Sequence, residues 1–264
     1  MRDIWYGSYF LSLVRAGYAV VATDYAGLGA ETGPAEFLAK RAHAYDTLFS
    51  FPAARKAVPQ LGAEWLAIGH SQGGYAVLAT DELIAELRRR GDPVGGYRGA
   101  AAVAPVADLR GAFSRWTAQP QSAGLATLLV KGATASGSRL KASEILSTEA
   151  LRRLPVLSRG CLDVITAVYS DLVEGDLIRP GGLRKLEPFL RANEPGTRTA
   201  GPLLIQQGSA DVVVTELESA ALVANLRKAG ASVTYQTYPD GDHLGVLAQS
   251  LPETLTWIAG RFSS

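Results

Sequence analysis

Ser71 stands at the centre of residues 69–73, which read Gly-His-Ser-Gln-Gly. A serine hydroxyl is a weak nucleophile at neutral pH, and it attacks a carbonyl carbon only when a base accepts its proton. That base is usually a histidine whose ring is oriented by a carboxylate. Glycines two positions before and after a serine permit the sharp, strained turn that exposes a nucleophilic hydroxyl at the end of a strand. The pattern therefore makes Ser71 a candidate nucleophile, whose base and acid must come from elsewhere in the chain.

The base has three candidates, because the chain contains three histidines. His70 adjoins the serine on the same turn, where its ring cannot easily face the hydroxyl. His43 falls inside a long predicted helix, where packing or capping is the expected role. His243 follows the last predicted strand, and loops at the carboxyl ends of strands are where open α/β sheets place their sites. We therefore predict that His243 is the base.

The carboxylate is expected between the serine and the histidine in chain order. Asp211 follows a predicted strand and precedes His243 by one predicted helix and one predicted strand. This spacing places the two side chains on adjacent loops at one edge of a parallel sheet. We therefore predict that Asp211 orients the histidine, with Asp108 as the alternative acid.

The segments on either side of Ser71 favour a strand, a turn and a helix in that order. Residues 64–68 form a short, mostly apolar run that indicates a buried strand, and residues 72–90 carry apolar side chains at helical spacing. The first N–H groups of such a helix, at its positive dipole end, are suited to bind a developing oxyanion. We expect the backbone N–H of Gln72 to be an oxyanion donor.

Strand and helix patterns alternate along most of the chain. Predicted strands cover 18–24, 64–68, 97–104, 201–207 and 232–238, and predicted helices cover 3–16, 35–58, 72–90, 215–228 and 250–262. This alternation predicts an α/β fold with a parallel sheet and helices on both faces.

The stretch 108–200 breaks the alternation, because its segments look helical throughout, most clearly over 160–172. We interpret it as a helical cap inserted between two strands, with extra helices flanking the sheet as the alternative. The chain is thereby divided into an N-terminal part of the core (1–107), the cap insertion (108–200) and a C-terminal part of the core (201–264).

The composition limits the class of protein. The chain has 264 residues, is 47% hydrophobic and can bury a sizeable core, while its net charge of +1 gives no basic field for nucleic acid. Cys161 is the single cysteine, which excludes an internal disulfide, and we expect its thiol to be buried. No apolar run reaches membrane-spanning length, and the first residues lack the apolar stretch of a signal peptide.

Together these features resemble the α/β-hydrolase superfamily and, within it, the secretory lipase/esterase family. The most family-specific run is 17–25, Gly-Tyr-Ala-Val-Val-Ala-Thr-Asp-Tyr, and the serine turn, Asp211 and His243 also match. The resemblance implies cleavage of a small-molecule ester or lipid through an acyl-serine, an acyl pocket shaped by the cap, and no metal or organic cofactor. It also suggests export, although this chain carries no signal peptide, so its location and its oligomeric state stay open.

The chain departs from this family at its N-terminus. Members carry three strands and an oxyanion loop before the helix predicted here at 3–16, and the third strand lies between the equivalents of 18–24 and 64–68. We therefore expect either that 18–24 pairs directly with 64–68 or that the chain is a fragment of a longer protein. Without the oxyanion loop one oxyanion donor is missing, so we expect turnover about 10²–10³-fold below that of an enzyme with both donors.

Other functions remain open at this point. A peptidase or an acyltransferase uses the same three side chains, and the specificity lies in the cap rather than in the fold. A truncated hydrolase fold that binds without catalysis is favoured by the missing strands, but the presence of Ser71, Asp211 and His243 argues against it. The prediction is a serine hydrolase that cleaves carboxylic esters.

Overall fold

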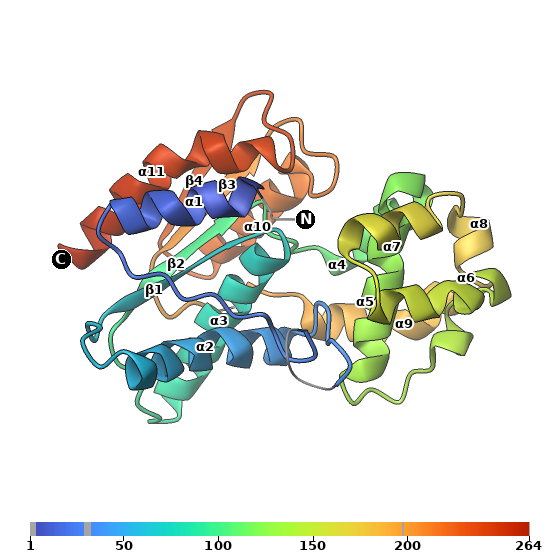
Figure 1. Ribbon diagram of the computed structural model, residues 1–264, viewed down its shortest axis with the longest axis horizontal. Coiled ribbons are helices and arrows are strands. Elements are labelled where there is room, and N and C mark those ends of the chain that lie inside the picture. The colour runs from blue at the N-terminus through green and yellow to red at the C-terminus, as the bar shows by residue number, and fades with distance from the viewer. Residues whose placement is uncertain (1–3, 29–32, 197, 264) are drawn as a thin grey trace. The chain divides into compact units, whose positions relative to one another are not determined.

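The structure is a computed structural model that describes residues 4–28, 33–196 and 198–263. In chain order its elements are α1 (Ile4–Arg15), α2 (Lys40–Ala57), β1 (Trp65–His70), α3 (Gln72–Arg89), β2 (Tyr97–Val103), α4 (Leu109–Ala118), η1 (Pro120–Ser122), α5 (Ala123–Ala135), η2 (Ala142–Glu144), α6 (Thr148–Arg153), η3 (Leu154–Ser158), α7 (Leu162–Tyr169), α8 (Glu174–Leu177), α9 (Gly182–Asn193), β3 (Leu203–Gly208), α10 (Glu216–Lys228), β4 (Val233–Tyr238) and α11 (Gly245–Phe262), where η marks a 3-10 helix (Figure 1).

The chain divides into two compact units. The sheet unit comprises Met1–Asp24, His43–Ala107 and Pro195–Ser264, and the helical unit comprises Tyr25–Ala42 and Asp108–Glu194. The boundaries at residues 108 and 200 that the sequence indicates stay predictions.

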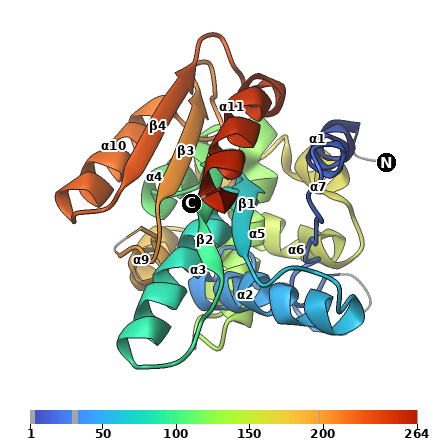
Figure 2. The ribbon, with the colours of Figure 1, turned by 90° about the vertical axis from the view of Figure 1, so that its left-hand side faces the viewer.

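Four parallel strands form the sheet in the order β1-β2-β3-β4 (Figure 2). The pairing runs from Ile68 to Ala101, from Ala101 to Leu204 and from Leu204 to Thr234. Parallel neighbours need long crossovers, and α3 and α10 supply two of them. The predicted parallel α/β architecture is confirmed.

Alternation along β1 explains how helices cover both faces of the sheet. Trp65 and Ala67 belong to a core formed with α2, α3 and α10, whereas Leu66 and Ile68 belong to a core formed with α1 and α11. Successive side chains of a strand point to opposite faces, so an apolar run without polar interruption is what a doubly covered strand requires.

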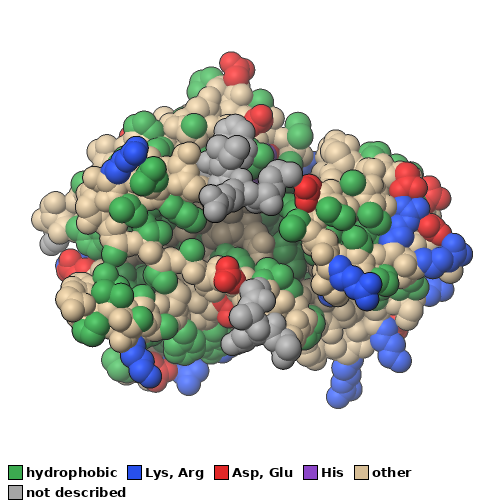
Figure 3. Space-filling model, in the orientation of Figure 1, with side chains coloured by type: hydrophobic (Ala, Val, Ile, Leu, Met, Phe, Trp, Pro, Cys, Tyr) green, Lys and Arg blue, Asp and Glu red, His purple; other side chains and the backbone are tan. Residues whose placement is uncertain are grey.

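The predicted strand 18–24 is wrong. These residues form no strand, they do not pair with β1, and β1 is an edge of the sheet. The β-branched pattern of the segment is typical of a strand, but a strand exists only with a hydrogen-bonding neighbour. Val20 and Val21 are instead 38% and 51% exposed, and Figure 3 shows exposed hydrophobic side chains over this part of the sheet unit.

The helix predicted over 215–228 starts where expected, whereas the helix predicted over 250–262 starts earlier. A capping box of Thr215 and Glu218 opens α10, with the Thr215 side chain accepting from the Glu218 N–H. The predicted start at residue 250 is wrong, because α11 already begins at Gly245. Ser250 lies inside α11, where its hydroxyl donates to the Leu247 carbonyl at 3.3 Å.

The helical unit has its own core, in which Phe113, Trp116, Leu129 and Tyr169 are buried. The helix predicted over 160–172 is present as the shorter α7. Cys161 directly precedes α7 at its N-cap position and is exposed, so the expectation of a buried thiol is wrong.

Asp81 is a buried carboxyl that ties three segments of the sheet unit together. Its oxygens accept from the Tyr97 hydroxyl at 2.8 Å and from the backbone N–H groups of Ala200 and Gly201 at 2.9 and 3.1 Å. Burial is the largest influence on its pKa and raises it to about 6 despite these three bonds.

This pKa predicts a pH dependence of stability. The pKa of Asp81 rises from 3.8 to about 6 on folding, so ionisation costs the folded state more than the unfolded state. Its stabilising effect is complete below about pH 4 and is lost as the pH rises through 6. In urea unfolding, the stability of the wild type relative to Asp81→Asn is expected to fall by up to about 3 kcal/mol between pH 4 and pH 8. The control is Asp92→Asn, which removes an exposed carboxylate. If the free energy of unfolding of the wild type and of Asp81→Asn changed with pH in parallel, the raised pKa of Asp81 would be contradicted.

Candidate active site

Ser71 occupies the turn between β1 and α3. Its backbone lies at φ 56° and ψ −115°, a strained conformation for a residue with a side chain. The turn is fixed because the Ser71 N–H donates to the Val103 carbonyl at 2.9 Å. A Cβ on Gly69 would overlap the backbone of Gly73, and a Cβ on Gly74 would lie 2.9 Å from Pro105. The predicted strand, turn and helix are therefore present, and the glycines are there because backbone segments approach closely.

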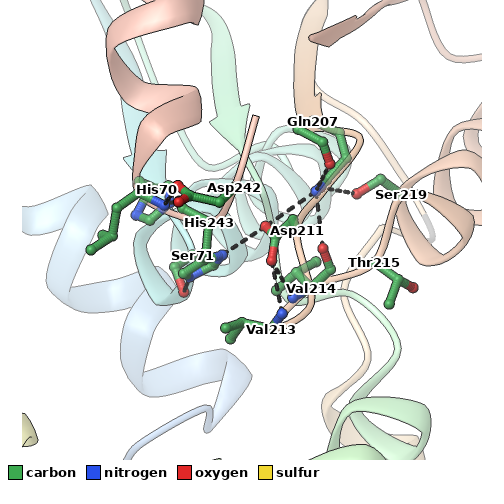
Figure 4. A network of polar contacts seen from close by, with 12 residues as sticks. His70, Ser71, Gln207, Asp211, Val213, Val214, Thr215, Ser219, Asp242 and His243 are labelled. Carbon is green, nitrogen blue, oxygen red and sulfur yellow. Dashed lines mark hydrogen bonds and ion pairs between the residues drawn. The ribbon is translucent and has the colours of Figure 1, made fainter. Parts of the chain in front are cut away.

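The structure brings the three predicted side chains into one chain of contacts (Figure 4). His243 Nε2 lies 2.9 Å from Ser71 Oγ, and His243 Nδ1 lies 2.7 Å from Asp211 Oδ2. They stand after β1, β3 and β4, at the carboxyl ends of parallel strands. A carboxylate only accepts hydrogen bonds, so we assign the proton to Nδ1 and leave Nε2 free to accept from the serine hydroxyl.

Asp211 is buried and ionised. Burial is the largest single influence and raises its pKa, but the hydrogen bond and charge of His243 and the N–H groups of Val214 and Val213 outweigh it. These N–H groups donate to Oδ1 at 2.9 and 2.8 Å. The net effect lowers the pKa of Asp211, so a carboxylate stays opposite the imidazole at neutral pH.

Gln207 is a member of this network that the sequence reasoning missed. It is fully buried near the end of β3, and its amide nitrogen lies 3.2 Å from Asp211 Oδ2 and 2.9 Å from the Val214 carbonyl. Ser219 of α10 donates to its amide oxygen at 2.7 Å (Figure 4). A glutamine pair inside a predicted buried strand was the available signal, since buried amides need partners.

Gln72 is the first residue of α3, so its backbone N–H has no acceptor within the helix. Its side-chain nitrogen lies 2.9 Å from His43 Nε2. Burial lowers the pKa of His43 to about 4, so the ring is neutral and its Nε2 accepts from the amide. His43 also contacts the ring of Tyr75 edge-on. His43 thus packs against α3 and holds the Gln72 side chain.

The alternative acid has a different partner in the structure. The side chain of Asp108 accepts from the Gly111 N–H at 2.8 Å and caps α4. Among the residues that the structure describes, no cluster of three or more His, Cys, Asp or Glu side chains is arranged to hold a metal ion. Within the same residues, no helix is both long and apolar enough to cross a membrane.

The family described as serine aminopeptidase, S33, matches residues 4–246, and the chain belongs to this family of α/β hydrolases. The predicted α/β-hydrolase superfamily is thus confirmed, while the narrower likeness to secretory lipases and esterases stays a prediction. No curated protein sequence gives a significant match.

Solved structures share the fold at low sequence identity. A Legionella pneumophila protein provisionally classed as a hydrolase is 18% identical, with a TM-score of 0.79 over 93% of this chain and 70% of its own. Candida antarctica lipase A is 19% identical, with a TM-score of 0.72 over 86% of this chain. The rice cell wall degrading esterase LipA from Xanthomonas oryzae is 17% identical, with a TM-score of 0.71 over 89% of this chain. The chain spans 56% of that lipase and 69% of that esterase.

Proposed function

We propose that the protein is a serine hydrolase that cleaves carboxylic esters through an acyl-serine intermediate. The observation that carries the proposal is the continuous chain from Ser71 Oγ to His243, at 2.9 Å, and from His243 to the buried Asp211, at 2.7 Å. Nucleophile, base and orienting carboxylate within hydrogen-bond reach of one another define the chemistry of acyl transfer.

In the first half of the reaction, Ser71 Oγ forms a bond to the ester carbonyl carbon as its proton passes to His243 Nε2. The carbonyl electron pair moves onto oxygen, and the Gln72 N–H donates to this oxyanion. When the carbonyl re-forms, the carbon–alcohol bond breaks, and His243 returns the proton to the leaving alkoxide. Asp211 stabilises the imidazolium throughout and does not take the proton itself.

In the second half, water replaces the alcohol. His243 Nε2 accepts a proton from the water as the water oxygen attacks the acyl carbon, and the oxyanion forms again at the Gln72 N–H. Collapse breaks the bond to Ser71 Oγ, which recovers its proton from His243, and the carboxylic acid is released. Hydrolysis therefore consumes one ester and one water and regenerates the hydroxyl.

The likeness to a lipase and an esterase supports small-molecule esters or lipids as substrates, but it rests on the fold alone. The description of the family as serine aminopeptidases favours a second candidate, removal of an N-terminal residue from a peptide by the same three side chains. We favour ester cleavage because the family-specific run 17–25 resembles the secretory lipase/esterase family.

Matched substrates separate the two candidates. We expect hydrolysis of p-nitrophenyl butyrate, little hydrolysis of the corresponding butyryl p-nitroanilide, and none of alanine p-nitroanilide. The release of the coloured product is followed for each substrate with the wild type and with Ser71→Ala. Turnover of alanine p-nitroanilide above that of the ester would overturn the ester assignment in favour of an aminopeptidase. Absence of Ser71-dependent turnover of all three would support the non-catalytic alternative.

A further inference from the structure

His70 has no part in the steps above, yet it lies directly beside the catalytic histidine. Its Nε2 is 2.6 Å from the backbone carbonyl oxygen of His243, and its Nδ1 is 2.6 Å from the hydroxyl of Tyr6 in α1. The ring centroids of the two histidines are 4.6 Å apart (Figure 4), and His70 is only 7% exposed. A buried imidazole whose two nitrogens both have partners holds a fixed orientation.

The chemistry of the partners defines the protonation of this ring. The carbonyl oxygen of His243 only accepts, so His70 Nε2 must carry a hydrogen. Burial and, after it, the neighbouring His243 lower the pKa of His70 to about 4, so the ring is neutral at working pH. Nδ1 therefore accepts, and the Tyr6 hydroxyl donates to it. The result is a directed chain from the Tyr6 hydroxyl through His70 to the His243 carbonyl.

This series of hydrogen bonds links the residue next to the nucleophile with the backbone of the base. His70 is bonded covalently to Ser71, and its ring holds the backbone of the residue that supplies the base. The neighbouring loop is held by Asp242, which accepts from the Leu244 and Gly245 N–H groups, but these bonds fix the residues after His243. The hydrogen bond from His70 differs from the Asp242 bonds because it is made to the backbone of His243 itself.

We propose that His70 is a positioning residue that holds His243 at hydrogen-bond distance from Ser71, and that Tyr6 fixes the tautomer in which it does so. The inference rests on the proposed function, because it concerns the placement of the base. A displacement of about 1 Å at a reacting group can reduce the rate about 10²-fold. A neutral ring at this position also adds no positive charge beside His243 when the base takes its proton.

Four variants test the proposal through turnover of p-nitrophenyl butyrate. We expect His70→Leu, which loses both bonds, to lower kcat about 10²-fold and to leave KM within about 2-fold. His70→Gln, whose amide N–H can replace the Nε2–H, is expected to recover most of this loss. Tyr6→Phe is expected to lower kcat about 5- to 10-fold, the effect of one hydrogen bond.

Tyr9→Phe is the matched control, since Tyr9 lies on the same helix and donates instead to Thr254 at 3.3 Å. We expect Tyr9→Phe to leave kcat unchanged. Equal kcat in wild type and His70→Leu, or equal losses in Tyr6→Phe and Tyr9→Phe, would overturn the proposal. A rise of KM with unchanged kcat would also overturn it, because positioning of the base acts on the chemical step.

Nitrogen-15 NMR of the histidine rings tests the same inference without any turnover. We expect a neutral His70 with hydrogen on Nε2 and a lone pair on Nδ1, and a change in the Nδ1 resonance in Tyr6→Phe but not in Tyr9→Phe. The opposite tautomer, or a mixture of both, would overturn the inference. A wild type with this tautomer but no ester turnover would instead count against the proposed function.

Discussion

Replacement of His243 by alanine is expected to remove ester turnover to the background level, a loss of about 10⁶-fold in kcat for an intact serine triad. In the proposed mechanism the Ser71 proton leaves through the 2.9 Å contact to His243 Nε2, and alanine has no group at this position that could accept it. A neutral hydroxyl attacks esters very slowly. The measurement is steady-state hydrolysis of p-nitrophenyl butyrate, with circular dichroism to establish that the variant is folded.

A change in the same loop provides the control for this variant. Asp240→Asn is conservative at a residue whose backbone has a positive φ of 55°, a conformation that Asn tolerates, and whose backbone N–H donates to Ser209. We expect Asp240→Asn to retain wild-type turnover. A folded His243→Ala variant with more than about one-tenth of wild-type kcat would show that another group is the base, since base removal in such triads costs far more.

The second large effect is expected from Asp211→Asn, about 10⁴-fold in kcat. The asparagine amide would donate to His243 Nδ1, where the carboxylate now accepts at 2.7 Å. The imidazole would then carry its hydrogen on Nε2 and point it at the serine, which is the wrong tautomer for a base. The loss therefore follows from a proton on the wrong nitrogen and not from a loss of size or burial. Steady-state hydrolysis of p-nitrophenyl butyrate gives kcat and KM, and we expect the change to appear in kcat.

Asp108→Asn is the matched control for Asp211→Asn, because it makes the same chemical change at the alternative acid. Asp108 caps α4, and asparagine is an equally good cap. We expect Asp108→Asn to keep wild-type turnover. If Asp108→Asn abolished turnover and Asp211→Asn did not, the assignment of the orienting carboxylate would be wrong.

The sequence predicted the positions of the three side chains because their placement follows from the order of elements. Each of Ser71, Asp211 and His243 lies in the turn or loop that follows a strand, and parallel strands end at one edge of a sheet. The glycines around Ser71 report on close backbone approach, which leaves a clear pattern in the sequence. Such patterns depend on residues that are close in the sequence, so they can be recognised before the fold is known.

Other features depend on contacts that no local pattern encodes. The partners of His70 are a hydroxyl 64 residues away and a carbonyl 173 residues away, so no local pattern around His70 indicated a role for it. The strand pattern of 18–24 was real, but a strand also needs a neighbour, and β1 is an edge of the sheet. The segment 25–42 belongs to the helical unit, which no feature of its composition indicated.

The most direct test of the account is covalent labelling of the folded chain with a fluorophosphonate, which reacts with a serine only when a base and an oxyanion site activate it. Mass spectrometry of the digested protein identifies the labelled residue. We predict one label for each chain, on Ser71, that is lost in Ser71→Ala, in His243→Ala and after unfolding in urea. A folded wild type that takes no label, or takes it on another serine, would contradict the assignment of Ser71 as an activated nucleophile.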